Sequence, residues 1–325
     1  MSDNSLWLVT GGAGFIGSNI AETLVKQGKR VRVLDNLSTG KLEFMASFKD
    51  KIEFIKGDIR AYEDCQRAVK GVDYVLHQAA IRAVAKSVDR PQETHEVNAT
   101  GTLNMLMAAK EQKVKRLVYA SSSSAYGDAT KFPQKEDFKP QPLSPYACQK
   151  LMGEMYAIMF TKTYGLETVS LRYFNVFGPR QDPESLYSAV IPKFMEQAYL
   201  GEPLELHWDG KQQRDFTHIS NVVQANILGA TTKKGVGEAY NIANGKTYSL
   251  LDLIKVIEKI VGHKLERKHH PKRAGDVRKT YADISKAKRL LGYKPAMNFE
   301  DGLKDTWNYF VESYFKQKHG DVVPA

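Results

Sequence analysis

The chain decides its fold early, in the stretch LWLVTGGAGFIG at residues 6–17. A short apolar run leads at once into closely spaced glycines, and a helical pattern of apolar residues follows through Ile20, Leu24 and Val25. Glycines in such a turn let the backbone bend sharply and approach a pyrophosphate, while the amino terminus of the helix supplies N–H donors to the phosphates. The stretch therefore predicts a strand, a phosphate-binding turn and a helix.

An acidic residue at the end of the next strand indicates which dinucleotide binds. Residues 31–35 read VRVLD, which places Asp35 about 20 residues beyond the glycines. A carboxylate at that position accepts hydrogen bonds from the adenosine ribose hydroxyls and repels a 2′-phosphate. The predicted cofactor is therefore NAD rather than NADP. The structural alternative is that Asp35 is an ordinary strand-end aspartate.

Strand and helix patterns alternate along the first half of the chain. Further strands are predicted at residues 52–55, 74–77, 116–120 and 168–172, with helical patterns between them that include 98–112 and 146–164. Alternation of this kind predicts a doubly wound parallel α/β (Rossmann) sheet with right-handed crossovers.

Beyond Pro179 the pattern changes to shorter, mixed elements. We therefore predict a dinucleotide-binding domain over residues 1–179 and a smaller mixed α/β substrate domain over 180–325, with the chain free to cross back between them. Helical periodicity after the boundary is clear at residues 189–200, 220–230, 250–261 and 299–315.

The composition excludes several classes of protein. Of the 325 residues 42% are hydrophobic, and no apolar run approaches the roughly 20 residues that a membrane span needs, so a cytoplasmic protein without a membrane partner is expected. Cys65 and Cys148 offer neither a disulfide framework nor a zinc site, and no metal is expected. The net charge of +10 is densest at residues 264–273 and is not accompanied by a basic helix interleaved with aromatics, which argues against nucleic-acid binding.

A second group of residues points to proton transfer. Tyr146 and Lys150 are four residues apart, and Pro145 suits the first turn of a helix, so both side chains should project from one helix face. The serine run 121–124 ends a predicted strand at the sheet edge where ligands bind. An ammonium close to the phenol, with a positively charged nicotinamide nearby, favours the phenolate and makes Tyr146 a general base. The spacing alone would also suit a solvated surface pair.

These motifs occur in one order, followed by RYFN at residues 172–175. In that order the chain resembles the extended short-chain dehydrogenase/reductases that modify nucleotide sugars, from about Leu6 to about Phe315, and it looks most like the UDP-hexose 4-epimerases. The resemblance implies that Tyr146 is the base, that Lys150 is its electrostatic partner and a ribose ligand, and that the Ser122 hydroxyl relays the proton.

The resemblance also implies the residues of both binding sites. Those expected to line the NAD site are Gly11, Gly14, Phe15, Ile16, Asp35, Asn36, Ser38, Gly40, Asp58, Ile59, Ala79, Arg82, Asn98, Tyr146, Lys150 and Tyr173. Those expected to meet the substrate are Ser122, Ser123, Ser124, Asn175, Arg214, Arg273 and Thr280. Arginines in pairs grip a diphosphate through charge-assisted hydrogen bonds, although as bare residues they could be surface charges.

The implied reaction takes the 4-hydroxyl proton to Tyr146 and the C4 hydride to NAD, and it returns both after the 4-keto sugar has rotated. Related 4,6-dehydratases carry Asp-Glu where this chain has Ser123 and Ser124, and UDP-glucuronate decarboxylases carry a glutamate at the place of Ser124. Both reactions are therefore less favoured. A nucleotide-sensing protein without catalysis would typically lack the pair of Tyr146 and Lys150.

The choice of sugar depends on Thr280, seven residues after Arg273. In the epimerases this position forms a wall of the sugar pocket, where tyrosine excludes an N-acetyl group and a small residue admits it. Residues 180–192 also resemble the subgroup that acts on UDP-N-acetylhexosamines and their uronic acids. We therefore expect UDP-N-acetylglucosamine, with UDP-glucuronate as the alternative because threonine is common in that group, or UDP-glucose/galactose.

Two predicted helices carry more apolar surface than one sheet face should need. The residues concerned are Met105, Met107, Met152, Met155 and Met159. The resemblance implies that these helices pair across a two-fold axis into a four-helix bundle, so that the protein is a homodimer. The alternative is that both helices pack only within their own core.

Overall fold

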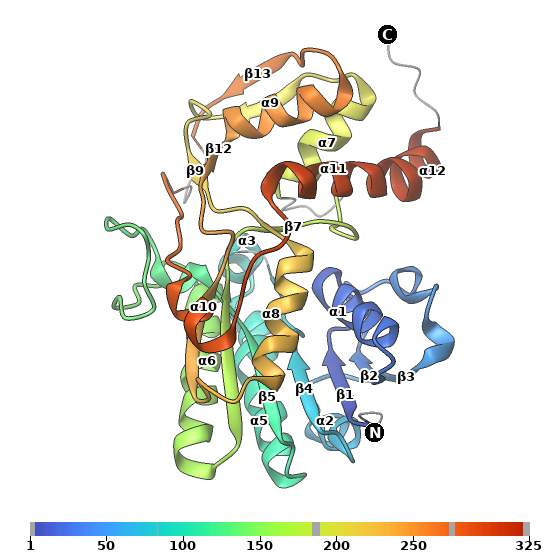
Figure 1. Cartoon of the computed structure of the whole chain (residues 1–325), viewed down its shortest axis with the longest axis vertical. Coiled ribbons are helices and arrows are strands. Elements are labelled where there is room, and N and C mark those ends of the chain that lie inside the picture. The colour runs from blue at the N-terminus through green and yellow to red at the C-terminus, as the bar shows by residue number, and fades with distance from the viewer. Residues whose placement is uncertain (1–3, 83, 184–188, 273–276, 321–325) are drawn as a thin grey trace.

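The computed structural model describes residues 4–82, 84–183, 189–272 and 277–320. Its centre is a seven-stranded sheet in the order β11-β6-β5-β4-β1-β2-β3, in which all neighbours are parallel (Figure 1). The strands are β1 Leu6–Thr10, β2 Arg30–Asp35, β3 Ile52–Lys56, β4 Tyr74–His77, β5 Arg116–Ser122, β6 Glu167–Tyr173 and β11 Glu238–Ile242. The predicted doubly wound sheet is confirmed.

Helices cover both faces of this sheet, which is why the central strand β1 is buried along its whole length. In β1, Trp7 and Val9 belong to the hydrophobic cluster on one face, and Leu6 and Leu8 belong to the cluster on the other. The first face is covered by α1 and α8, and the second by α2, α5 and α6. Their bounds are α1 Phe15–Lys26, α2 Tyr62–Val69, α5 Gly101–Glu111, α6 Pro145–Tyr164 and α8 Ile219–Thr231.

Shorter helical segments join these elements. They are the 3₁₀ turns Leu42–Met45, Lys49–Lys51 and Ser123–Tyr126, the helices α3 Val84–Asp89 and α4 Pro91–His95, and the π-helical turn Glu96–Thr100. The helix predicted over 98–112 therefore starts as a π turn and becomes α-helical at Gly101.

A smaller unit lies above the carboxyl ends of the parallel strands (Figure 1). It has its own hydrophobic cluster, built largely from α7, α9 and α11. Its elements are α7 Val190–Leu200, β8 Leu204–His207, α9 Leu250–Val261, β13 Arg267–His270, α11 Phe299–Phe310, the π turn Val311–Phe315 and α12 Lys316–His319. Strand β13 runs parallel to β8. Two-residue strands link the units, with β7 Val176–Phe177 beside β10 Thr217–His218 and β9 Gln213–Arg214 beside β12 Tyr248–Ser249.

The chain crosses between the two units more than once. After entering the smaller unit it returns to the sheet with α8 and β11, and it returns again with α10 Ser285–Leu291, which packs near β11. Residues 219–242 therefore belong in space with the first unit, although they follow the predicted boundary at 179. Among the described residues no helix is both long and apolar enough to span a membrane.

Candidate active site

The turn between β1 and α1 is so compact that side chains would not fit at its glycines. Gly11 has φ +65°, and a Cβ there would lie 2.9 Å from the backbone of Ala79. A Cβ on Gly17 would lie 2.1 Å from the Gly11 carbonyl oxygen. Gly14 is the N-cap of α1, and no side chain caps the helix there. The backbone N–H groups of Phe15 and Ile16 thus begin a helix whose amino terminus suits a phosphate, so the turn fits a dinucleotide.

Asp35 is held at the end of β2 by that same turn. One carboxylate oxygen accepts a hydrogen bond from the Ala13 N–H at 2.9 Å, and the other accepts from the Leu37 N–H at 2.8 Å. Burial raises the pKa of Asp35, and these two bonds oppose the rise. A Cβ on Gly40 would lie 2.9 Å from the carboxylate. The acid and the glycines predicted from separate stretches therefore form one feature.

The ends of β2 and β3 are joined by polar contacts. The Asn36 amide donates to Asp58 at 2.9 Å, and the Asn36 side-chain oxygen accepts from the Ser38 N–H at 3.0 Å. Burial opposes ionisation of Asp58, but hydrogen bonds from Arg60 outweigh it and lower the pKa of Asp58 to about 2. The Ile59 side chain is buried in the core, so any contact of this residue with the cofactor would come from its backbone.

The loop after β4 is fixed by buried polar groups. The Thr10 hydroxyl accepts from the backbone N–H groups of Gln78 and Ala79, each at 3.1 Å. Asn98, which is 1% exposed, accepts from the Ile81 N–H at 2.8 Å and donates to Gln149 of α6 at 2.9 Å. Asn98 therefore ties the loop that carries Ala79 and Arg82 to the helix that carries Tyr146.

Tyr173 lies behind this loop at the end of β6. Its hydroxyl donates to the Gln78 side chain at 3.0 Å and is also hydrogen-bonded to Asn226 of α8. The residue is 8% exposed, and burial raises its pKa strongly. Tyr173 is therefore a neutral, anchored residue beside the predicted cofactor site.

The structure brings the predicted proton-handling residues together. Helix α6 starts at Pro145, after Ser144 has capped it by accepting from the Ala147 N–H at 3.2 Å. The side chain of Ser122, the last residue of β5, lies close enough to the Tyr146 phenol to lower its pKa. Lys150 is 4% exposed and donates from Nζ to the Ala120 carbonyl at 2.9 Å. The strand end and the first turn of the helix thus meet as the sequence predicted.

Burial has the largest effect on the ionisation of Tyr146 in this structure. Burial raises the pKa of Tyr146 within the chain, and the Ser122 hydrogen bond and the charge of the exposed Arg82 only partly offset the rise. Burial also lowers the pKa of Lys150 to about 7, and its Nζ is held at the Ala120 carbonyl. That Lys150 and a bound nicotinamide together favour the phenolate stays a prediction.

The serine run continues from Ser122 into a 3₁₀ turn. The Ser122 Oγ accepts from the Ser124 backbone N–H at 3.2 Å and from the Ser124 hydroxyl at 2.9 Å. Ser123 begins the turn and is partly buried. All three serines lie at the carboxyl edge of the sheet, beside Tyr146.

The predicted substrate residues gather on the side that faces the smaller unit. Asn175, with φ +30°, donates to the Thr280 hydroxyl at 2.8 Å and to the Asp215 carbonyl at 3.3 Å. The Thr280 N–H donates to the Gln213 carbonyl at 3.0 Å, next to Arg214 on β9. Three segments far apart in sequence are therefore neighbours here. Arg273 lies outside the described residues.

Sequence reasoning missed Asp215, a fully buried carboxylate at the centre of this arrangement. It accepts from the backbone N–H groups of Asn244, Gly245 and Ala282 at 2.9–3.3 Å. Burial raises its pKa to about 7 against those bonds. The available signal was its position directly after Arg214. An acid that collects three backbone donors organises the segments around the substrate residues.

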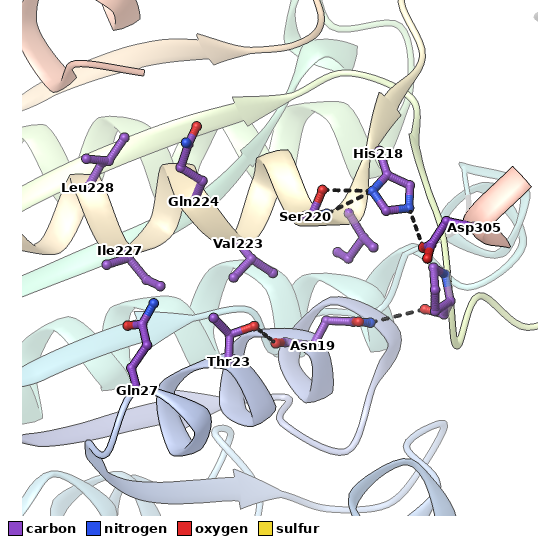
Figure 2. A pocket seen from close by; sticks show the side chains of 12 residues that line it. Asn19, Thr23, Gln27, His218, Ser220, Val223, Gln224, Ile227, Leu228 and Asp305 are labelled. Atoms are coloured by element: carbon purple, nitrogen blue, oxygen red, sulfur yellow. Dashed lines mark hydrogen bonds and ion pairs between the residues drawn. The ribbon is translucent and has the colours of Figure 1, made fainter. Parts of the chain in front are cut away.

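A cavity of about 390 Å³ lies elsewhere, between α1 and α8 (Figure 2). It is bordered by Asn19 and Thr23 on one side, by Val223 on the other, and by His218 and Asp305 at one end. None of the residues predicted for catalysis or binding lines it. Within the described part of the chain, no cluster of three or more histidine, cysteine or acidic side chains could hold a metal ion.

Comparison with known proteins gives consistent matches. The model of the NAD dependent epimerase/dehydratase family matches residues 7–243. UDP-glucose 4-epimerase of Thermotoga maritima, solved with UDP-glucose, is 39% identical with a TM-score of 0.90, over 95% of this chain and 99% of its own. UDP-N-acetylglucosamine 4-epimerase of Methanobrevibacter ruminantium M1, solved with UDP-N-acetylmuramic acid, is 37% identical with a TM-score of 0.91, over 96% and 99%. UDP-glucuronic acid 4-epimerase of Bacillus cereus, solved with UDP-glucuronic acid and NAD, is 34% identical with a TM-score of 0.87, over 95% and 100%.

Proposed function

The chain belongs to the NAD-dependent epimerase/dehydratase family, and we propose that within it the protein interconverts UDP-N-acetylglucosamine and UDP-N-acetylgalactosamine, or their uronic acids. The broader statement, a UDP-sugar 4-epimerase with NAD as its cofactor, rests on relatives that cover nearly the whole chain. The choice of hexose rests on the residues of the proposed substrate site.

The observation that carries the choice is the placement of Thr280. Its hydroxyl is hydrogen-bonded to Asn175, which we expect to meet the nucleotide diphosphate, and this contact supports a place for the threonine in the substrate site. Its side chain is small, which leaves room for an acetamido group. The similar structure of a UDP-N-acetylglucosamine 4-epimerase supports the same choice.

In the proposed cofactor site the glycine turn receives the pyrophosphate and Asp35 receives the adenosine ribose. Asn36, Ser38 and Asp58 border the adenine side through the hydrogen bonds that join the ends of β2 and β3. When it is bound, NAD accepts the hydride from C4 of the sugar.

The chain supplies the proton transfer and the binding. Tyr146 takes the 4-hydroxyl proton and later returns it, and Ser122, close to the same phenol, relays it. Lys150 is held behind the tyrosine by the Ala120 carbonyl, where it would bind the nicotinamide ribose. Asn175 and Arg214, together with Arg273, hold the diphosphate. Tight binding of the diphosphate and weak binding of the hexose let the 4-keto sugar rotate between the two half-reactions.

UDP-glucuronate is the second candidate substrate. Threonine at position 280 is compatible with it, and a UDP-glucuronic acid 4-epimerase is among the similar structures. A carboxylate on C5 would need a positive or hydrogen-bonding partner, which the hydroxyls of Ser123 and Ser124 could supply only in part.

We also propose a homodimer through α5 and α6. Met107, Met155 and Tyr164 are 37%, 62% and 50% exposed on these two helices, whereas Met105 is fully buried and contributes nothing to the surface. Met152 and Met159 are partly buried. An apolar strip shared by two adjacent helices is suited to pairing with its own copy into a four-helix bundle.

The test of the proposed function is a panel assay. Purified protein is incubated with UDP-N-acetylglucosamine, UDP-glucuronate and UDP-glucose without added NAD, and the products are followed by NMR. The proposal expects the N-acetylated sugar to have the highest kcat/KM. Faster conversion of UDP-glucuronate would replace the first candidate with the second.

A further inference from the structure

The loop between the serine run and Tyr146 does more than connect them. Its two ends are closed against each other, since the Gln141 N–H donates to the Ala125 carbonyl at 2.9 Å. A Cβ on Gly127, which has φ +62°, would lie 2.0 Å from the Gln141 carbonyl oxygen. Residues 126–140 therefore form a loop whose two ends are fixed beside the proton-handling site.

In the middle of this loop, Gln134 is hydrogen-bonded to the segment that follows Thr280. Gln134 is 1% exposed. Its side-chain oxygen accepts from the Tyr281 N–H at 3.1 Å, and its backbone N–H donates to the Tyr281 carbonyl at 2.6 Å. Its carbonyl accepts from the Asp283 N–H at 2.8 Å. The side chain and the backbone of this one residue thus hold both neighbours of Ala282, an arrangement that resembles a single rung of parallel sheet.

A buried asparagine of β11 locks this rung to the catalytic side. Asn241 donates to the Gln134 carbonyl at 2.9 Å and to the Asp283 carbonyl at 3.2 Å. Its side-chain oxygen accepts from the Tyr126 hydroxyl at 2.7 Å, and Tyr126 ends the 3₁₀ turn that contains Ser123 and Ser124. Hydrogen bonds therefore connect Tyr126 to Tyr281, the residue after Thr280, through Asn241 and Gln134.

We propose that Gln134 is a positioning residue for sugar specificity, because it sets where the Thr280 wall stands relative to Tyr146. The inference rests on the proposed function and deepens it. Thr280 is held on its other side by Asn175 and by the Gln213 carbonyl, so loosening the Gln134 side frees the wall to tilt about those two contacts. A substrate that uses the wall, UDP-N-acetylglucosamine, loses more than UDP-glucose, which does not reach it.

The test compares Gln134→Met, which keeps the length of the side chain but removes the acceptor, with Lys139→Met on an exposed position of the same loop. In Gln134→Met the ratio of kcat/KM for UDP-N-acetylglucosamine to that for UDP-glucose should fall about threefold to tenfold, the equivalent of one net hydrogen bond. NAD retention should not change, and Lys139→Met should keep the wild-type ratio. A merely structural role would lower both substrates alike and leave the ratio unchanged, which would overturn the inference.

Hydrogen exchange on the wild type keeps the inference testable if Gln134→Met does not fold. The amides of Tyr281 and Asp283 should exchange slowly, because Gln134 accepts a hydrogen bond from both. Rapid exchange at these amides would show that Gln134 does not hold this segment, and it would overturn the inference. The two levels of failure are distinct. A wild type that converts no UDP-hexose refutes the proposed function, whereas an active wild type with an unchanged ratio in Gln134→Met refutes only the role of Gln134.

Discussion

Replacing Thr280 with tyrosine tests the proposed wall of the sugar pocket. The change removes the hydroxyl that accepts from Asn175 at 2.8 Å, and it adds an aromatic ring beside the place where the sugar must turn. Loss of the hydrogen bond costs about 0.5–1.5 kcal/mol and affects every UDP-sugar in the same way. Overpacking costs about 1–3 kcal/mol and falls on the substrate with the larger C2 substituent.

Only the second contribution changes the preference between substrates. It corresponds to a decrease of roughly 5- to 150-fold in kcat/KM for UDP-N-acetylglucosamine relative to UDP-glucose. The assay measures both values for the wild type, Thr280→Tyr and the matched control Thr280→Ser, which retains the hydroxyl and should keep the wild-type ratio. An unchanged ratio in Thr280→Tyr, with folding intact, would refute the placement of this residue at the sugar.

Three other predictions concern charge, stability and assembly. Burial lowers the pKa of Lys150 to about 7, so between pH 7 and its ordinary pKa of 10.5 the unfolded chain binds one proton more than the folded chain. The difference in free energy of unfolding between the wild type and Lys150→Met, measured by urea titration, should therefore rise with pH across this window. A difference that does not change with pH would contradict this prediction. Arg172 of β6 and Glu154 of α6 form a buried ion pair with an N–O distance of 2.6 Å. Arg172→Met leaves the Glu154 carboxylate without its charge partner and should lower the free energy of unfolding by about 3–5 kcal/mol, while a loss below 1 kcal/mol would show that the pair is not desolvated. Met155→Glu should make the protein monomeric by light scattering, and a wild type that is itself monomeric would exclude the dimer.

The sheet was predictable because its strands are short apolar runs, each bounded by a turn signal. Strand β11 was missed for a physical reason. Its five residues include Glu238 and Asn241, and Asn241 is fully buried because it bonds to Tyr126 and to other segments, which no local hydrophobic pattern reveals. Its neighbour β6 ends well before it in the chain, so the pairing follows from the tertiary fold.

The candidate site divides in the same way. Tyr146 and Lys150 could be predicted because their chemistry depends on spacing within one helix turn. The acid Asp215 and the clamp at Gln134 could not, because each acts by joining segments that are distant in sequence. The pKa of Lys150 also lay beyond sequence reasoning, since it is set by burial in the folded chain.

We propose that this chain epimerises a UDP-N-acetylhexosamine at C4, with Tyr146 as the acid and the base. The most direct measurement incubates the wild type and Tyr146→Phe with UDP-N-acetylglucosamine and follows the formation of UDP-N-acetylgalactosamine by NMR, with bound NAD quantified in both proteins. We predict conversion by the wild type, and a rate lower by about 10²–10⁴ in the variant with NAD still bound. Turnover by Tyr146→Phe at nearly the wild-type rate would contradict the role of Tyr146 as the acid and the base.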